Sequence, residues 1–141
     1  VIYHKKVKDD VLALKEVRRV LKPGGVFVLR VPANQYLMSA HDRHVHTARR
    51  YERNELIGKI KKAGLSLRQI SFVHSPIFFL SLARIFFERI TNEPNSSAVG
   101  NLNPILNKCL TVVLDLEASL ISRGIPLPLG QGLIVVATRK G

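Results

Sequence analysis

The segment HDRHVH gathers side chains that can ligate metals or move protons. These are His41, Asp42, His44 and His46. Imidazole and carboxylate groups are zinc ligands, so three of them converging would form a zinc site. However, no cysteine lies near, and the spacing matches neither a helical histidine pair at i and i+4 nor a zinc-ribbon pattern. We therefore expect a polar loop here and no resident metal.

The elements before this loop must position it. Residues 7–21 place apolar side chains at helical spacing, with acidic residues first and basic residues last, which predicts an amphipathic helix. Pro23 cannot continue that helix, and Gly24 or Gly25 can adopt the left-handed conformation that ends it. The apolar, β-branched run VFVLRV then predicts a strand at 26–31, buried on both faces as in a parallel sheet.

The periodicity of the remaining chain predicts five more elements: a helix at 53–63, a strand at 65–73, helices at 75–90 and 104–122, and a strand at 133–140. The stretch 91–104 is rich in Asn, Ser, Pro and Gly, so we expect a mobile loop there. Three strands make a thin sheet with a bare edge, and we expect further residues or a second copy to cover it.

Four runs of the chain resemble class I S-adenosylmethionine-dependent methyltransferases. ALKEVRRVLKPGGVFVLRVP, at 13–32, resembles the segment that leads into the fifth strand of their Rossmann-like sheet. VIYHKKVKDD resembles the loop after strand four, and HDRHVHTARRYERNELIGKIKKAGLSLRQISFV is similar to the passage into strand six. LPLGQGLIVVATRK is similar to the closing antiparallel strand. The resemblance covers 1–73 and 126–140, and it leaves 74–125 as a helical insertion.

The resemblance implies an α/β fold that is a partial Rossmann-like methyltransferase sheet. Residues 26–31 would be strand five, 65–73 strand six, and 133–140 strand seven, antiparallel between the other two. The whole chain, 1–141, would then be the C-terminal part of a methyltransferase domain. The rival interpretation is a non-catalytic binding or dimerisation module derived from the same half-sheet.

The resemblance also implies S-adenosylmethionine as cofactor and methyl transfer to an acceptor that the sequence does not identify. The family's glycine-rich loop after strand one and the acidic residue ending strand two have no counterpart here. We therefore expect the main cofactor contacts upstream of Val1, and no activity from this chain alone. Tyr3 and His4, in the loop matching the one after strand four, would border the methionine end of the cofactor.

The loop after strand five would lie at the C-terminal edge of the sheet, where open α/β proteins bind ligands. His41 or His46 is then a candidate base, because histidine titrates near neutrality. The arginines and the tyrosine that follow would orient an anionic group of the acceptor, or else Arg50 and Tyr51 would fasten the loop to the next helix. The substrate-side residues implied are Asp42, His44, Arg49, Arg50 and Tyr51.

The charge and composition of the chain indicate which classes of binding partner to expect. A net charge of +12 would attract phosphate, an anionic lipid surface or an acidic protein. Nucleic acid is not expected, because the basic residues are scattered and the chain has 0 Trp and 3 Tyr. The lone Cys109 excludes a disulfide within the chain and favours the cytoplasm.

We expect the apolar helix at 77–90 to pack over the sheet or to form a homodimer face. The exposed sheet edge is the other candidate homodimer face. A lid over a small-molecule or lipid-like acceptor and peripheral contact with a membrane are the alternatives.

Overall fold

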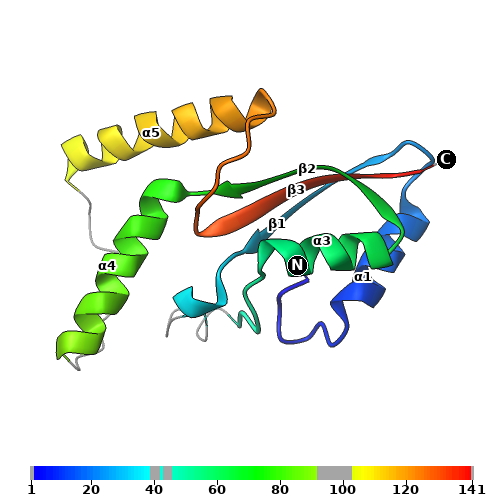
Figure 1. Ribbon diagram of the computed structural model, residues 1–141, viewed down its shortest axis with the longest axis horizontal. Coiled ribbons are helices and arrows are strands. Elements are labelled where there is room, and N and C mark those ends of the chain that lie inside the picture. The colour runs from blue at the N-terminus through cyan, green and yellow to red at the C-terminus, as the bar shows by residue number, and fades with distance from the viewer. Residues whose placement is uncertain (1, 39–41, 43–45, 92–102, 141) are drawn as a thin grey trace.

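The computed structural model describes residues 2–38, 42, 46–91 and 103–140 (Figure 1). Within them, β1 (Val26–Pro32), β2 (Leu65–Val73) and β3 (Gly132–Arg139) form one sheet in the order β1-β3-β2. β3 is antiparallel to both neighbours. The expectation that the last strand lies antiparallel between the two earlier ones is confirmed. Their assignment as strands five, six and seven of a larger Rossmann-like sheet stays a prediction.

The predicted helices are present among the described residues. They are α1 (Asp10–Val20), α3 (Arg53–Lys62), α4 (Ser75–Thr91) and α5 (Pro104–Ser122), with a short 3-10 helix, η1 (Gln35–Leu37), after β1. α1 begins later than predicted because Asp9 caps it, its carboxylate accepting the Leu12 amide at 2.9 Å. The predicted loop at 91–104 falls mostly outside the described residues.

The turn between α1 and β1 uses its two glycines differently. Gly24 adopts the left-handed backbone conformation, with φ +74°, in which a residue with a β-carbon would be strained. At Gly25 a β-carbon would stand 2.8 Å from the carbonyl oxygen of Lys22. The sharp Pro-Gly-Gly turn therefore needs both glycines, and it delivers the chain from α1 directly into β1.

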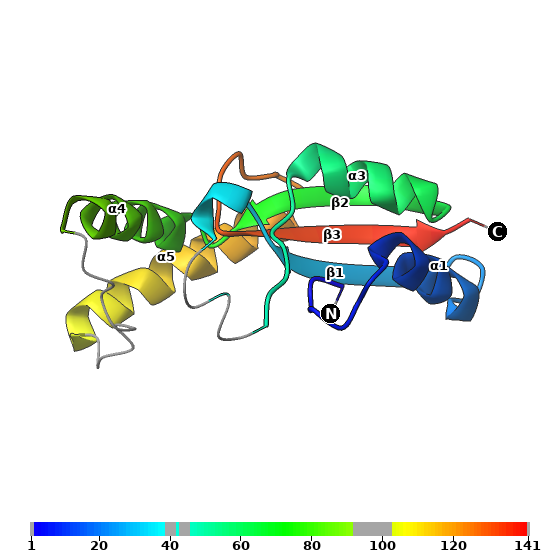
Figure 2. The same ribbon diagram turned by 90° about the horizontal axis from the view of Figure 1, so that it is seen from below.

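Two helices cover one face of the sheet. Figures 1 and 2 show α1 and α3 together on that face, with α5 on the opposite face and α4 extending beyond the end of the sheet. The core lies between the sheet and the helix pair. Its fully buried members are Leu14, Val31, Ala33, Tyr51, Leu56, Ile60, Leu133, Val135 and Ala137.

The expectation that the strand at 26–31 is buried on both faces is wrong. Leu29 and Val31 are buried against the helix pair, whereas Val26 is 60% exposed and Val28 58% exposed on the other face. The reason is the layering, since no helix in the described ranges covers that side of β1. β1 is an edge strand that pairs with β3 alone among the strands described.

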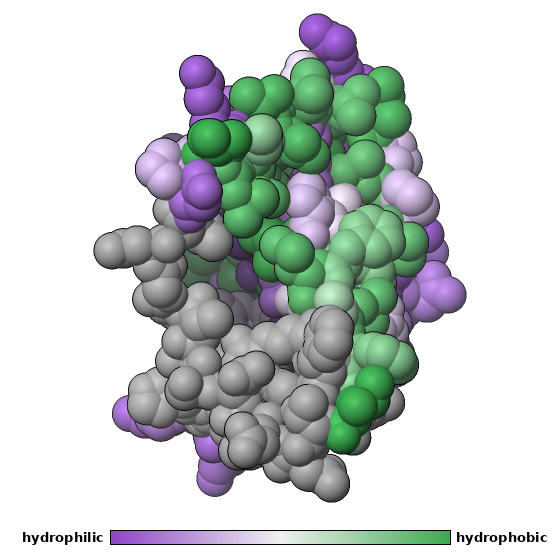
Figure 3. All heavy atoms as spheres, turned by 90° about the vertical axis from the view of Figure 1, so that its left-hand side faces the viewer, coloured by the Kyte–Doolittle hydropathy of each residue, from purple (hydrophilic) through white to green (hydrophobic). Residues whose placement is uncertain are grey.

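A second exposed apolar region lies on α4 and α5. Figure 3 looks onto the end of the molecule where these helices lie and shows apolar side chains over much of that face. We call this region the α4–α5 apolar surface; it comprises Phe79, Leu80, Phe86, Ile90, Ile105, Leu106, Val112, Val113, Leu116 and Leu120. No helix in the described part of the chain has the length and apolarity needed to cross a membrane.

Candidate functional site

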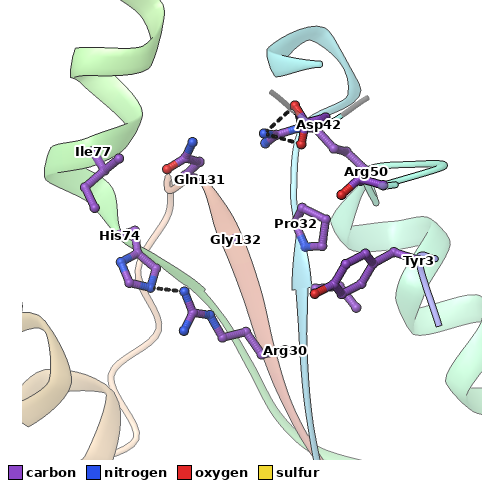
Figure 4. Close-up of a pocket in the computed structure, with 11 residues that line it drawn as sticks. Tyr3, Arg30, Pro32, Asp42, Arg50, His74, Ile77, Gln131 and Gly132 are labelled. Atoms are coloured by element: carbon purple, nitrogen blue, oxygen red, sulfur yellow. Dashed lines mark hydrogen bonds and ion pairs between the residues drawn. The ribbon is translucent and has the colours of Figure 1, made fainter. Parts of the chain in front are cut away.

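A cavity of about 610 Å³ lies at the end of the sheet where β1 and β2 finish and β3 begins. Its volume falls in the range of small-molecule sites, roughly 300–1,000 Å³. Figure 4 shows the side chains around it. The lining residues are Tyr3, Arg30, Val31, Pro32, Asp42, Thr47, Arg50, His74, Ile77, Gln131 and Gly132. This is the edge at which β1 and β2, which run in the same direction on either side of β3, both end, as the resemblance implies for a ligand site.

One wall of the cavity is formed by Arg30, from the edge strand β1, and by His74, which directly follows the other edge strand, β2. A guanidinium nitrogen of Arg30 lies 2.5 Å from Nε2 of His74 (Figure 4). Burial lowers the pKa of His74, and the positive charge of Arg30 lowers it further, while the nearby Glu117 carboxylate opposes both. The neutral ring accepts from Arg30 at Nε2, so its proton is on Nδ1.

Glu117 holds His74 in place. Its buried carboxylate on α5 accepts the backbone N–H groups of His74 and, at 2.9 Å, of Ser75. These two amides precede or begin α4, so an acid from α5 caps the α4 N-terminus. His74 takes a left-handed backbone conformation there, with φ +63°. The position of the ring in the cavity wall therefore depends on the packing of α5.

Asp42 and Arg50 form the opposite wall as a buried ion pair. Arg50 donates to both carboxylate oxygens of Asp42 at 3.0–3.2 Å and to the Ala33 carbonyl at 3.0 Å. Each side chain is 6% exposed. These contacts tie the loop to the end of β1 rather than to the following helix, the partner expected in the fastening alternative. Contact of Arg50 with a substrate stays a prediction.

Arg49 and Tyr51 bind to the Asp10 carboxylate, outside the cavity. The Asp10 Oδ2 atom accepts from the Tyr51 hydroxyl at 2.9 Å, from Arg49 at 3.2 Å and from Lys59 at 2.5 Å. Neither Arg49 nor Tyr51 is among the lining residues, and Tyr51 is fully buried. This cluster joins the start of α1, the segment before α3 and α3 itself. The structure thus gives Tyr51 the contacts of a fastening residue.

The charges of this cluster are coupled. Burial tends to raise the pKa of Asp10, but hydrogen bonds from Lys59 and Tyr51, with the charges of Lys59 and Arg49, lower it overall. Burial also raises the pKa of Tyr51, and its hydrogen bond to Asp10 adds to the increase, so the phenol stays protonated. Asp10 is therefore an ionised carboxylate held by three donors.

The predicted histidines and cofactor residues are divided between the cavity and the surface. Tyr3 lines the cavity, whereas His4 and His46 do not; their rings contact each other edge to face at 5.9 Å. His41 and His44 lie outside the described residues, so their roles as base and substrate residue stay predictions. In the part of the chain that the structure describes, no three His, Cys, Asp or Glu side chains gather as metal ligands would.

Sequence reasoning missed Arg30, His74 and Gln131 as cavity residues. A signal existed for Arg30, because it is the single charged residue in the otherwise apolar run VFVLRV. A charged side chain in a strand of that composition indicates a strand end or a functional position. No comparable signal marks His74, whose place in the cavity depends on the pairing of β2 with β3.

Comparison with known proteins found no matching family model and no matching curated protein. Two solved structures of phosphoethanolamine N-methyltransferase 2 from Haemonchus contortus are similar to the chain. One, in complex with S-adenosyl-L-methionine, has a TM-score of 0.47 and 16% identity, over 100% of this chain and 32% of that one. The other, with phosphomonomethylethanolamine and S-adenosylhomocysteine, has a TM-score of 0.43 and 15% identity, over 96% and 31%. The chain spans about a third of the length of these structures.

Proposed function

We propose that this chain is the substrate-side part of an S-adenosylmethionine-dependent methyltransferase domain. The observation that carries the proposal is the topology, in which β3 is antiparallel and lies between β1 and β2. The motifs in 13–32 and 126–140 imply this arrangement through their resemblance to class I methyltransferases. The cavity at the carboxyl edge of β1 and β2 supports it further, since that edge binds ligands in open α/β folds.

The residues of this chain fit one part of a cofactor site. Tyr3 stands in the cavity wall, where it would border the methionine end of the cofactor. When bound, S-adenosylmethionine supplies a methyl group on a sulfonium that leaves readily, so positioning supplies most of the rate. The work of this chain is then to bind and orient the acceptor at the cavity and to exclude water from it. The acceptor is a small molecule, lipid-like or otherwise.

The glycine-rich loop that would hold most of the cofactor is not in this sequence. We therefore propose that residues 1–141 act within a longer domain, in which α4 and α5 form a helical insertion, and that the chain alone does not turn over. Val26 and Val28 are exposed on the uncovered face of β1, although valine in a strand favours packing against neighbouring side chains. This exposure supports the proposal, because further residues of a longer domain would cover that face.

The test compares two proteins made from the reading frame of this chain: residues 1–141 alone, and the same residues with everything encoded upstream. S-adenosylhomocysteine binding is measured by calorimetry, and methyl transfer is measured with methyl-labelled cofactor. We expect binding and transfer from the longer protein and neither from residues 1–141. The proposal is wrong if the upstream sequence lacks a strand followed by a glycine-rich loop and the longer protein does not bind.

The second candidate function is a binding or dimerisation module without catalysis. The observation that favours it is the α4–α5 apolar surface, whose members include Phe86, 64% exposed, and Ile105, 75% exposed. Apolar patches of this kind mark interaction sites. Self-association of a protein that binds no S-adenosylhomocysteine would favour the module over the enzyme.

A further inference from the structure

We infer that Arg30 and His74 form an oxyanion subsite, which takes a phosphate or carboxylate group of the molecule bound in the cavity. Only the identification of that molecule as the methyl acceptor rests on the proposed function. The subsite itself rests on the charges, the hydrogen bonds and the position of these two side chains.

The charge of the cavity wall supports the subsite. Among the lining residues, Asp42 and Arg50 form a two-point ion pair, while Arg30 faces the neutral ring of His74. The carboxylate of Glu117 also acts on His74, but it is buried and accepts two backbone N–H groups at the start of α4. The lining residues therefore carry one positive charge in excess, at Arg30.

The hydrogen-bonding groups of the pair also support an anionic ligand. A guanidinium offers five N–H donors in a planar fork that matches an oxyanion, and Arg30 uses one of them on His74. Nδ1 of His74 is buried and has no hydrogen-bond partner within the described ranges. An oxyanion placed between the two side chains would accept from Arg30 and favour the protonated ring, which donates from both nitrogens.

The position of the pair defines how a ligand would extend. Figure 4 shows Arg30 and His74 on one side of β1 and Tyr3 on the other, with Pro32 between them. Ile77 adds an apolar wall beside His74. A molecule anchored by its oxyanion at Arg30 would therefore extend across the end of β1 toward Tyr3. That direction leads from the anion subsite to the side where the cofactor is expected.

The test uses the 141-residue chain, with inorganic phosphate and acetate as probes of the two oxyanion classes. Binding is measured by calorimetry, and the ring signals of His74 are followed by NMR. We expect saturable binding, a rise in the pKa of His74 on binding, and about a tenfold or greater loss of affinity in Arg30→Gln. Tighter binding of phosphate indicates a phosphate ester as the natural ligand, and tighter binding of acetate a carboxylate.

Arg68→Gln is the matched control, because Arg68 is an exposed arginine of β2 that does not line the cavity. It removes the same charge from the same sheet and should leave binding unchanged. Equal losses in both variants, or no saturable binding of either probe with an unmoved His74 signal, would overturn the subsite. Neither outcome depends on the cofactor, so failure here is distinguishable from failure of the methyltransferase proposal.

Discussion

At the residue scale, the carboxylate of Asp10 joins three segments of the chain through Arg49, Tyr51 and Lys59. Replacing Asp10 with Asn leaves these donors without their charged acceptor. We expect Asp10→Asn to lower the free energy of unfolding by about 3 kcal/mol, the lower end for breaking a buried ion pair. Urea denaturation measures this. Asp9→Asn is the control, since it removes a neighbouring carboxylate while asparagine still caps α1, and it should change stability little.

The same carboxylate makes stability depend on acid pH. Its pKa in the folded chain is below the ordinary value of 3.8, so its contribution is complete above that value and is lost as the pH falls below it. The wild-type chain should therefore lose more free energy of unfolding than Asp10→Asn between about pH 5 and pH 3. Parallel acid profiles of the two proteins would show that Asp10 is not the group responsible.

His74 should make anion binding depend on pH. In the chain without a ligand, the pKa of His74 lies below its ordinary value of 6.5, and a bound anion favours the protonated ring. Sulfate affinity should therefore rise as the pH falls from about 8 to 5, a range in which sulfate keeps its charge. His74→Asn should flatten the profile, and asparagine tolerates the left-handed backbone at this position. A profile that is unchanged in the variant would exclude His74 from the subsite.

At the scale of elements, the segment before β3 packs against the end of β2 through Gly130. A β-carbon on Gly130 would stand 2.4 Å from the carbonyl oxygen of Val73, and this backbone cannot yield as a side chain can. We expect Gly130→Ala to lower stability by about 2–3 kcal/mol and to widen the cavity entrance near Gln131. Thermal unfolding followed by circular dichroism measures the change.

Gly58 provides the matched comparison for Gly130. It lies inside α3, and a β-carbon there would meet no atom within 4 Å. Gly58→Ala should raise the free energy of unfolding by about 0.5–1 kcal/mol, because alanine loses less conformational entropy in a helix. Similar effects of the two substitutions would contradict the contact between Gly130 and Val73.

At the scale of the whole molecule, the α4–α5 apolar surface gathers exposed apolar side chains from two helices. Exposed apolar side chains that are scattered singly need no explanation, but a gathered patch indicates an interaction site. We expect the chain to associate with a second copy through it, and Phe86→Ser with Leu116→Ser to shift the population to monomer in sedimentation experiments. Lys108→Ser, an exposed polar change on α5, should not. Binding of the monomeric wild-type chain to anionic vesicles would show that a membrane surface covers these helices instead.

The sequence by itself determined the elements and their order. Pro23 and the two glycines after it end α1 and begin β1, the apolar periods of 3.6 and 2 mark helices and strands, and the family motifs predict an antiparallel last strand. These signals are local, so they can be read from neighbours along the chain. They also led to the expectation that β1 is covered on both faces, which depended on a helix over the second face of β1 that the described residues do not supply.

The tertiary structure alone decided which polar side chains meet. Arg49 and Tyr51 stand in sequence like ligand-binding residues, but Asp10, about forty residues earlier, holds them. Arg30 and His74 are 44 residues apart and come together because β3 pairs both with β1, which holds Arg30, and with β2, which His74 directly follows. Charge pairing and desolvation depend on distances in space, which local patterns do not encode. For that reason, although Arg30 stands out in sequence as the one charge of an apolar run, its position facing the cavity became evident only in the folded chain.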